Sequence, residues 1–453
     1  MRFPSSIVRR WFVVLAAIGC LGLVSRAAQA EPVSFRKDIA PMLLDNCLAC
    51  HGAKKAEGGY RVDSFSRVMQ AGDSAAAPVT AKNLDDSELL RRIITEDEGE
   101  RMPLEGDPLP EEQVALLKRW IEEGAAYDGS AEDAPLASIV PPPTHPAAPE
   151  VYPATMPITA VAFSPDGAHV IAGGYHELTV WNTADGQLAR RIGNIGQRTY
   201  ALQFHPDGKT LAVGCGAPGK LGEVRLLSYE TGEVTRVLNS TSDVVLDIAF
   251  SPDGKRLAVA AADSLVRIFD VETGEEQRTI ASHSDWVMAV AWNADGSKLV
   301  SGSRDKTAKV FDANTGDLLV TYAGHNQPVM GVAFHPDGAE VFSCGGDNKL
   351  HRWKIDDGKK TAEVALGGEG HKLVIGGDHL FATSADKTAR HFEAKTQKQL
   401  RSLGGHQDWV LSAAYHDGTK RLATGSFDGE VRLWNLDDGA NVATIVAAPG
   451  FSR

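Results

Sequence analysis

The sequence predicts a multidomain protein in which a small all-α domain precedes an all-β propeller of seven blades. Helical apolar patterns are concentrated in residues 31–128, whereas the chain from about residue 154 onward is a repeat with strand-like patterning. At 453 residues the chain also exceeds one ordinary domain, since about 150 residues per domain suggests about three units. Glycine, at 45 residues, fits the many turns that short strands need.

Two kinds of turn measure the repeat independently. Asp-Gly turns place aspartates at Asp166, Asp207, Asp253, Asp295, Asp337 and Asp417. A second turn series places glycines at Gly186, Gly232, Gly274, Gly316, Gly358 and Gly439. Successive intervals are 41–46 residues until the last one, which is 80 or 81 residues and therefore contains one degenerate copy, visible as Leu380–His391. Seven copies result.

The fourth copy shows the expected layout of one unit. Apolar runs occur at 286–292, 298–303, 308–311 and 318–322, with Asp295-Gly296 and Thr315-Gly316 at two of the turns between them. A period of about 40–45 residues with four strands per unit is typical of a propeller. The C-terminal run 441–446 or residues 151–156 would supply the strand that closes the ring.

Residues 154–447 resemble the WD40 family, so the propeller is expected to be WD40-like. Gly324-His325 and Gly405-His406 match the Gly-His signature of that family, and Ser282-His283 nearly does. The resemblance implies that each histidine reaches an aspartate in the same blade, and the pairs His283–Asp305, His325–Asp347 and His406–Asp428 are each 22 residues apart. We interpret these as structural pairs, since buried polar groups are normally hydrogen-bonded.

The first thirty residues have the pattern of a secretory signal peptide. A basic start with Arg2, Arg9 and Arg10 precedes an apolar run over 11–24, and Ala28-Gln29-Ala30 is a small-residue cleavage site. A membrane anchor is the alternative, but the run is shorter than the ~20 residues a span needs. We therefore expect an exported protein, periplasmic or extracellular, with no stable membrane span after signal removal.

Residues 31–128 and 151–453 are expected to be the two folded domains, joined by a Pro/Ala-rich linker at 129–150. The linker holds six prolines, and polyproline-like segments are semi-extended.

Cys47-Leu48-Ala49-Cys50-His51 is a C-x-x-C-H motif, which marks covalent attachment of one c-type haem. Two thiols at this spacing form thioethers to the vinyl groups, and the histidine that follows reaches the iron from one face. A thioredoxin-like pair would need a βαβ context, and a zinc site would need further ligands nearby. The sequence therefore predicts a small c-type cytochrome domain, with Cys47 and Cys50 as attachment sites and His51 as an axial ligand.

The second axial ligand has three candidate methionines. Met42 lies on the helix that leads into the motif and is poorly placed for the opposite haem face. Met69 is in a short amphipathic stretch, while Met102 lies in a loop between two helical segments and is our preferred ligand. An open or water-bound iron remains an alternative.

Three amphipathic helices are expected around the motif. Their apolar stripes are Phe35, Ile39 and Leu43; Leu89, Leu90, Ile93 and Ile94; and Val114, Leu117, Trp120 and Ile121.

Residues 33–125 resemble the planctomycete-type cytochrome c domain. The matching pieces are Cys47–Gly52, the run 58–64, Arg101-Met102-Pro103 and the helix through Trp120. The resemblance implies His51 and Met102 as axial ligands. Leu104 stands where the family commonly has a second proline.

The charge balance bears on partners. With 46 basic and 59 acidic residues the net charge is −13, which argues against nucleic acid as the main partner. We expect one-electron transfer to a redox partner protein with a basic face, and a propeller that serves as a docking or assembly platform for protein. Whether the chain is also an enzyme is left open: the alternatives are an oxidoreductase with an active site in the propeller and the haem as electron outlet, and a haem-based sensor or scaffold.

The remaining cysteines, Cys215 and Cys344, occupy near-equivalent places three blades apart, so no disulfide is expected.

Overall fold

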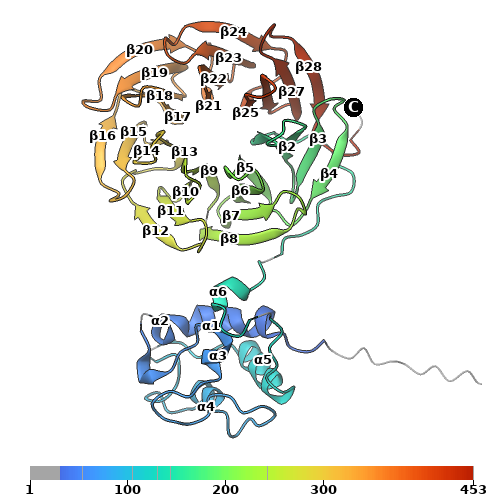
Figure 1. Cartoon of the computed structure of the whole chain (residues 1–453), viewed down its shortest axis with the longest axis vertical. Coiled ribbons are helices and arrows are strands. Elements are labelled where there is room, and N and C mark those ends of the chain that lie inside the picture. Colours follow the sequence, from blue (N-terminus) through green and yellow to red (C-terminus); the bar gives the residue numbers. More distant parts are fainter. Residues whose placement is uncertain are drawn as a thin grey trace, which may run out of the picture. The chain divides into compact units, whose positions relative to one another are not determined.

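The computed structural model describes residues 31–451 apart from 54, 105, 130, 143 and 242. The chain divides into two compact units between Pro141 and Pro142, and each is described by itself (Figure 1). The signal peptide expected at residues 1–30 lies outside the described residues and stays a prediction. None of the helices in the described part of the chain combines the length and apolar character that a membrane-spanning helix needs.

The first unit is built from short helices joined by long irregular segments. Its α-helices are α1 (Ala40–Asn46), α2 (Leu48–His51), α3 (Phe65–Val68), α4 (Glu88–Ile94), α5 (Glu111–Glu122) and α6 (Leu136–Ile139). A π-helical turn, Phe35–Ile39, leads into α1, and a 3-10 turn spans Glu57–Gly59.

An aromatic group forms the centre of the first unit. The ring of Phe35 packs edge-on against that of Phe65, with ring centroids 4.9 Å apart, and its centroid lies 5.4 Å from that of Trp120. The three expected apolar stripes face this core, with one correction: Ile94 is 48% exposed. Leu89, Leu90 and Ile93 already cover the inner face of α4, and the next residue at a helical 100° step falls outside it.

The segment 129–150 is divided between the two units. Leu136 and Ile139 of α6 are buried in the first unit, where Leu136 N–H donates to the Asp63 carbonyl (2.9 Å). His145 instead contacts the propeller, and its N–H donates to Oδ1 of Asn194 (2.8 Å).

The second unit consists of seven four-stranded antiparallel sheets, each made of four strands consecutive in the chain. The first four are β1–β4 (Val161–Phe163, His169–Gly173, Leu178–Asn182, Leu188–Ile192), β5–β8 (Arg198–Phe204, Thr210–Ala217, Leu221–Ser228, Val234–Thr241), β9–β12 (Val245–Phe250, Arg256–Ala261, Val266–Asp270, Glu276–Ile280) and β13–β16 (Val287–Trp292, Lys298–Ser303, Ala308–Asp312, Leu318–Tyr322). The last three are β17–β20 (Val329–Phe334, Glu340–Gly345, Lys349–Lys354, Lys360–Ala365), β21–β24 (Gly370–Gly376, His379–Ser384, Thr388–Glu393, Gln399–Gly404) and β25–β28 (Val410–His416, Arg421–Ser426, Glu430–Asn435, Asn441–Val446). This arrangement confirms the predicted seven-bladed propeller, seen as a ring in Figure 1.

The strands of the fourth blade lie where the repeat predicts them, within one residue at each end. The turn glycines Gly296 and Gly316 have φ of 72° and 82°, a backbone conformation that glycine adopts without a steric penalty. The degenerate copy is a complete blade, and its Asp386–Thr388 turn repeats that of Asp305–Thr307. In both turns the threonine hydroxyl donates to the aspartate at 2.6 Å.

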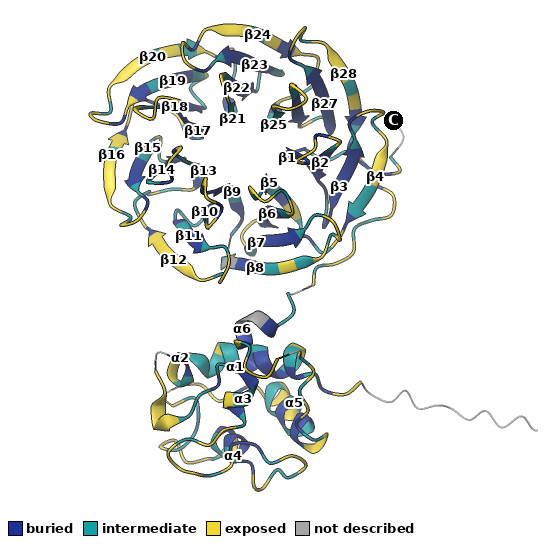
Figure 2. Cartoon of the chain, viewed as in Figure 1, coloured by how far each residue is buried: buried dark blue, intermediate teal, exposed yellow. Residues whose placement is uncertain are grey.

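The C-terminal strand β28 pairs with β27 and completes the last blade, so the ring closes between two whole blades. At this junction Ile158 N–H donates to the Ser426 carbonyl (3.0 Å), and the Ser412 hydroxyl donates to the Ile158 carbonyl (2.7 Å). Figure 2 shows the middle strands of the blades buried and the outermost strands largely exposed, as burial between neighbouring blades requires.

Candidate functional site

The start of α2 brings the three motif residues together. The N–H groups of Cys50 and His51 both donate to the Cys47 carbonyl, at 3.2 and 3.0 Å, so the motif forms a single helical turn. Residues three and four apart in a helix share a face, which places both sulfurs and the imidazole on one side of the turn. Cys47 and Cys50 are free cysteines.

A backbone carbonyl orients the imidazole of His51. Its Nδ1 lies 3.3 Å from the Tyr60 carbonyl oxygen, and with the proton on Nδ1 the ring donates this hydrogen bond. Tyr60 is itself held, since its hydroxyl donates to the Val68 carbonyl (3.0 Å). Such a bond at one ring nitrogen leaves the other, Nε2, with its lone pair, which is the arrangement of a metal-binding histidine.

The Met102 loop is tied to α4. Met102 N–H donates to the Arg92 carbonyl (2.8 Å), and the preceding Arg101 N–H donates to the Asp97 carbonyl (2.8 Å). Met69 packs against the hydrophobic core, and Met42 is buried within it. Of the three candidate methionines, Met102 lines the cavity described in the next paragraph.

A cavity of about 580 Å³ opens between these elements. Cys47, Cys50, His51 and Met102 all line it, although the first and last are 55 residues apart. Polar and charged side chains line part of the remaining wall, and its apolar lining residues are Val62, Ala76, Pro78, Leu89, Ile93, Pro103, Leu104 and Leu109. This size and lining are typical of a small-molecule or cofactor site.

The donor set fits a c-type haem. Two unpaired thiols, an imidazole with Nε2 available and a thioether sulfur meet in one apolar cavity. Burial raises the pKa of the Cys47 thiol to about 11, and the nearby Cys50 adds to this, so Cys47 is a neutral thiol at pH 7.

Comparisons with known families agree with this geometry. Residues 47–106 match the model of the family described as planctomycete cytochrome C. Four segments, 151–182, 274–312, 316–354 and 397–435, match the WD domain, G-beta repeat, and residues 240–292 match the anaphase-promoting complex subunit 4 WD40 domain. The chain joins a planctomycete cytochrome c domain to a seven-bladed WD40 propeller. The first of these domains implies a c-type haem and the capacity for electron transfer.

Curated relatives are similar over limited segments. The chain is 32% identical over 105 residues to apoptotic protease-activating factor 1 of Rattus norvegicus, 38% over 112 residues to DDB1- and CUL4-associated factor 13 of Homo sapiens, and 31% over 101 residues to coronin-7 of Mus musculus. These matches cover 20%, 24% and 20% of this chain, and 8%, 23% and 11% of those proteins.

Several charged residues that line the cytochrome cavity were missed from the sequence, and two of them lie on α4. Glu88 and Arg92 line it from α4, and Nε of Arg92 donates to Oε1 of Glu88 (2.8 Å). Hydrogen bonds from the neighbouring Arg91 lower the pKa of Glu88 to about 2. Helical periodicity carried a signal for them, because Arg92 is three residues after the apolar Leu89 and four after Glu88, which places both beside the apolar stripe.

The propeller confirms the three predicted His–Asp pairs. Nδ1 lies 2.8 Å from the aspartate in His283–Asp305 and His325–Asp347, and 3.3 Å in His406–Asp428. In each case Nε2 also bonds a hydroxyl in the same blade, Ser301, Ser343 or Thr424. Both ring nitrogens are therefore engaged, as a structural role requires.

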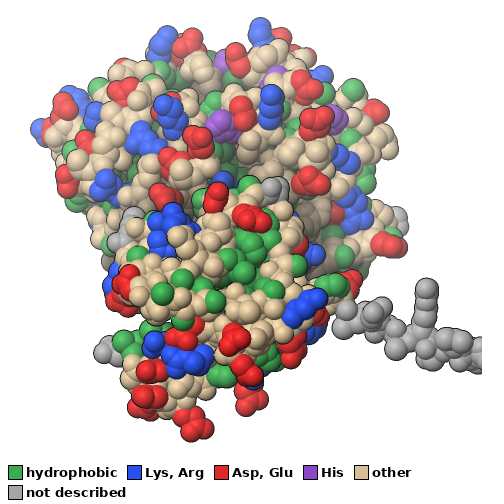
Figure 3. All heavy atoms as spheres, turned by 60° about the horizontal axis from the view of Figure 1, so that its bottom comes forward, with side chains coloured by type: hydrophobic (Ala, Val, Ile, Leu, Met, Phe, Trp, Pro, Cys, Tyr) green, Lys and Arg blue, Asp and Glu red, His purple; other side chains and the backbone are tan. Residues whose placement is uncertain are grey.

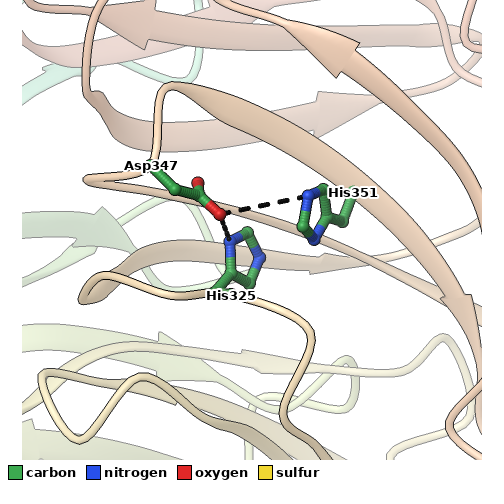
Figure 4. Close-up of side chains that lie close together, drawn as sticks. All are labelled: His325, Asp347 and His351. Carbon is green, nitrogen blue, oxygen red and sulfur yellow. Dashed lines mark hydrogen bonds and ion pairs between the residues drawn. The ribbon is translucent and has the colours of Figure 1, made fainter.

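His351 adds a second imidazole to one of these pairs (Figure 4). Its Nε2 lies 4.0 Å from Oδ2 of Asp347, which also bonds His325. However, the two imidazole rings stack nearly parallel, with centroids 4.0 Å apart and planes 15° from each other. Ring lone pairs lie in the ring plane, so one ion cannot sit at a bonding distance of ~2 Å in both planes. This arrangement excludes joint coordination of a metal by His325 and His351.

Proposed function

We propose that this chain is an exported mono-haem c-type cytochrome that transfers single electrons, with the propeller as a docking or assembly platform for protein. The observation that carries the proposal is the convergence of Cys47, Cys50, His51 and Met102 on one apolar cavity. Three of these residues lie within one five-residue motif, but Met102 is brought there only by folding.

Each of the four residues has a distinct part. The sulfurs of Cys47 and Cys50 would hold the haem through thioether bonds, and Nε2 of His51 and Sδ of Met102 would bind the iron. The haem supplies a one-electron change of iron oxidation state. The Tyr60 carbonyl fixes the His51 ring, and the Arg92 carbonyl fixes the backbone of Met102, so neither ligand has to be ordered when the oxidation state changes.

A six-coordinate iron favours electron transfer over ligand binding. If His51 and Met102 both bind the iron, small molecules would have no open site, and a methionine ligand would raise the reduction potential.

The partner is proposed to be a protein with a basic face. The net charge of −13 favours such a partner through long-range attraction. On the face drawn in Figure 3, acidic and basic side chains are interspersed with apolar patches, so we assign the attraction to net charge. The propeller suits docking, since WD40 propellers generally bind proteins.

Export rests on the basic start, apolar run and cleavage site in residues 1–30. Cleavage before Glu31 is testable by N-terminal sequencing of the mature protein.

The visible and near-infrared spectrum of the holoprotein tests the proposed ligation. We expect a methionine-sulfur-to-iron band that disappears in Met102→Leu and persists in the matched control Met69→Leu. Wild-type reduced protein should not bind carbon monoxide, whereas Met102→Leu should. A wild-type spectrum without this band, or ready carbon monoxide binding, would overturn the carrier function in favour of catalysis or sensing.

A further inference from the structure

The cytochrome cavity contains two basic side chains among its lining residues, and they lie in different chemical settings. Nζ of Lys55 is 2.7 Å from Oε1 of Glu57 and 3.9 Å from Sγ of Cys50. It therefore belongs to the part of the cavity where the thiols lie. Arg92 lines the wall formed by α4 and the Met102 loop, where its own carbonyl accepts the Met102 N–H.

The guanidinium of Arg92 has unused donors. Nε donates to Glu88, but Nη1 and Nη2 make no hydrogen bond with the described residues. Arg91 differs: its Nε and Nη2 both donate to Glu88 (2.7 and 2.8 Å), and its Nη1 donates to Glu100 (2.8 Å). A guanidinium with free terminal N–H groups is suited to bind a carboxylate.

A haem carries its two carboxylates, the propionates, on the porphyrin edge away from the vinyl groups that cysteine sulfurs attack. Since Lys55 lies at the thiols, it is on the wrong side for a propionate. Of the basic side chains that line the cavity, this leaves Arg92. The acidic lining residues Glu57, Asp73 and Glu88 cannot replace it, because carboxylates only accept hydrogen bonds when ionised.

We propose that Arg92 binds a haem propionate through its terminal guanidinium nitrogens while its carbonyl holds Met102. The inference rests on the proposed haem attachment. One helix residue would thus secure both the carboxylate edge of the cofactor and the loop that carries the second axial ligand. The carbonyl contact is a backbone one and survives substitution of the side chain, so the two roles are separable.

The test compares Arg92→Gln with Arg91→Gln in the full-length holoprotein. Loss of the positive charge leaves a propionate uncompensated, which stabilises ferric over ferrous iron. We expect the equilibrium constant for reduction by a mediator of known potential to fall about threefold to tenfold in Arg92→Gln. In Arg91→Gln we expect a change of less than about twofold, because Glu88 and Glu100 already neutralise that arginine.

A second readout reports the propionate directly. The propionate bending band in the resonance Raman spectrum should shift in Arg92→Gln and stay in place in Arg91→Gln, with the sulfur-to-iron band retained in both. Arg92→Lys keeps the charge without the planar fork and should give a smaller potential shift; it also serves if Arg92→Gln does not accumulate. Equal effects of the Arg92 and Arg91 substitutions, or an unmoved propionate band, would overturn the assignment. A wild-type protein without covalent haem would instead overturn the proposed function on which it rests.

Discussion

His51 in the cytochrome unit and His325 in the propeller are both held at Nδ1, but they differ at the other ring nitrogen. Nε2 of His325 bonds the Ser343 hydroxyl at 2.8 Å, and that hydroxyl also accepts from Nε1 of Trp353 (3.1 Å). Nε2 of His51 makes no hydrogen bond with the described residues, and the ring lines the cavity. The same residue type is thus structural where both nitrogens are bonded and available for chemistry where one is not.

The two units also differ in where they place their polar and reactive side chains. The propeller distributes its buried polar pairs among blades, so each pair stabilises its own turn. The cytochrome unit instead directs its distinctive side chains into one cavity. Substitutions should therefore separate into those that abolish haem binding and those that lower stability.

The largest effect is expected from removing the attachment thiols. Cys47→Ala combined with Cys50→Ala should abolish covalent haem completely, as measured by haem staining after denaturing electrophoresis. Cys344→Ala, in the core of the propeller, is the control and should retain the haem at a cost of about 1 kcal/mol in stability. Haem retention by the double variant would contradict the site.

Replacement of a bonded propeller histidine comes next. His325→Ala removes one hydrogen-bond partner each from the buried Asp347 and the Ser343 hydroxyl and should lower the free energy of unfolding by about 2–4 kcal/mol. Six of the eight tryptophans lie in the propeller, so fluorescence in a urea titration reports this loss, while the haem spectrum should not change. His169→Ala, at a partly buried position outside these pairs, should cost less than about 1 kcal/mol.

Protonation of His351 should make the stability of the propeller depend on pH. Burial lowers the pKa of His351 to about 4, and the nearby His325 adds to this. A histidine in the unfolded chain has a pKa of about 6.5. The stability that the folded protein keeps by holding His351 neutral is therefore fully present above about pH 6.5 and is lost as the pH falls toward 4. We expect a loss of about 1–3 kcal/mol over that window and a flatter profile in His351→Gln.

A further loss is expected at lower pH. Burial acts to raise the pKa of Asp305, but hydrogen bonds from Thr307 and His283 outweigh it and lower the value to about 2. Stability from this group is present above about pH 4 and is lost as the pH falls toward 2. An His351→Gln profile identical to wild type between pH 6.5 and 4 would contradict the assignment of the first loss.

The smallest effect concerns an ion pair between distant blades. Nζ of Lys372 on β21 lies 2.6 Å from Oδ1 of Asp247 on β9, and the aspartate is buried. Lys372→Met should destabilise the propeller by about 1–2 kcal/mol, because it leaves a buried carboxylate uncompensated. Lys395→Met removes an exposed pair with Asp378 and should cause no measurable change in stability. Equal effects would show that burial does not set the strength of these pairs.

Local patterns accounted for much of the molecule. The C-x-x-C-H motif acts within one helical turn, and the positive φ of turn glycines such as Gly296 is a property of a few neighbouring residues. The same local pattern occurs in seven copies, so the copies can be compared with one another, and the strands of the fourth blade were predicted to within a residue. The pairs 22 residues apart were found for the same reason, since each recurs at one place in a blade.

Other features required the folded chain. Whether Met69 or Met102 reaches the cavity depends on where the chain places each loop, and Arg92 was not recognised because the motif residues that share its cavity, Cys47, Cys50 and His51, are 41 or more residues away in sequence. The pairing of Lys372 with Asp247 joins residues 125 apart, and the burial of α6 takes part of the expected linker into the first unit. The helical turn, the blades and their count follow from the sequence alone, because these features depend on short-range periodicity. Which side chains share one cavity is set by the folded chain, because it depends on packing between elements whose local sequences contain no information about one another.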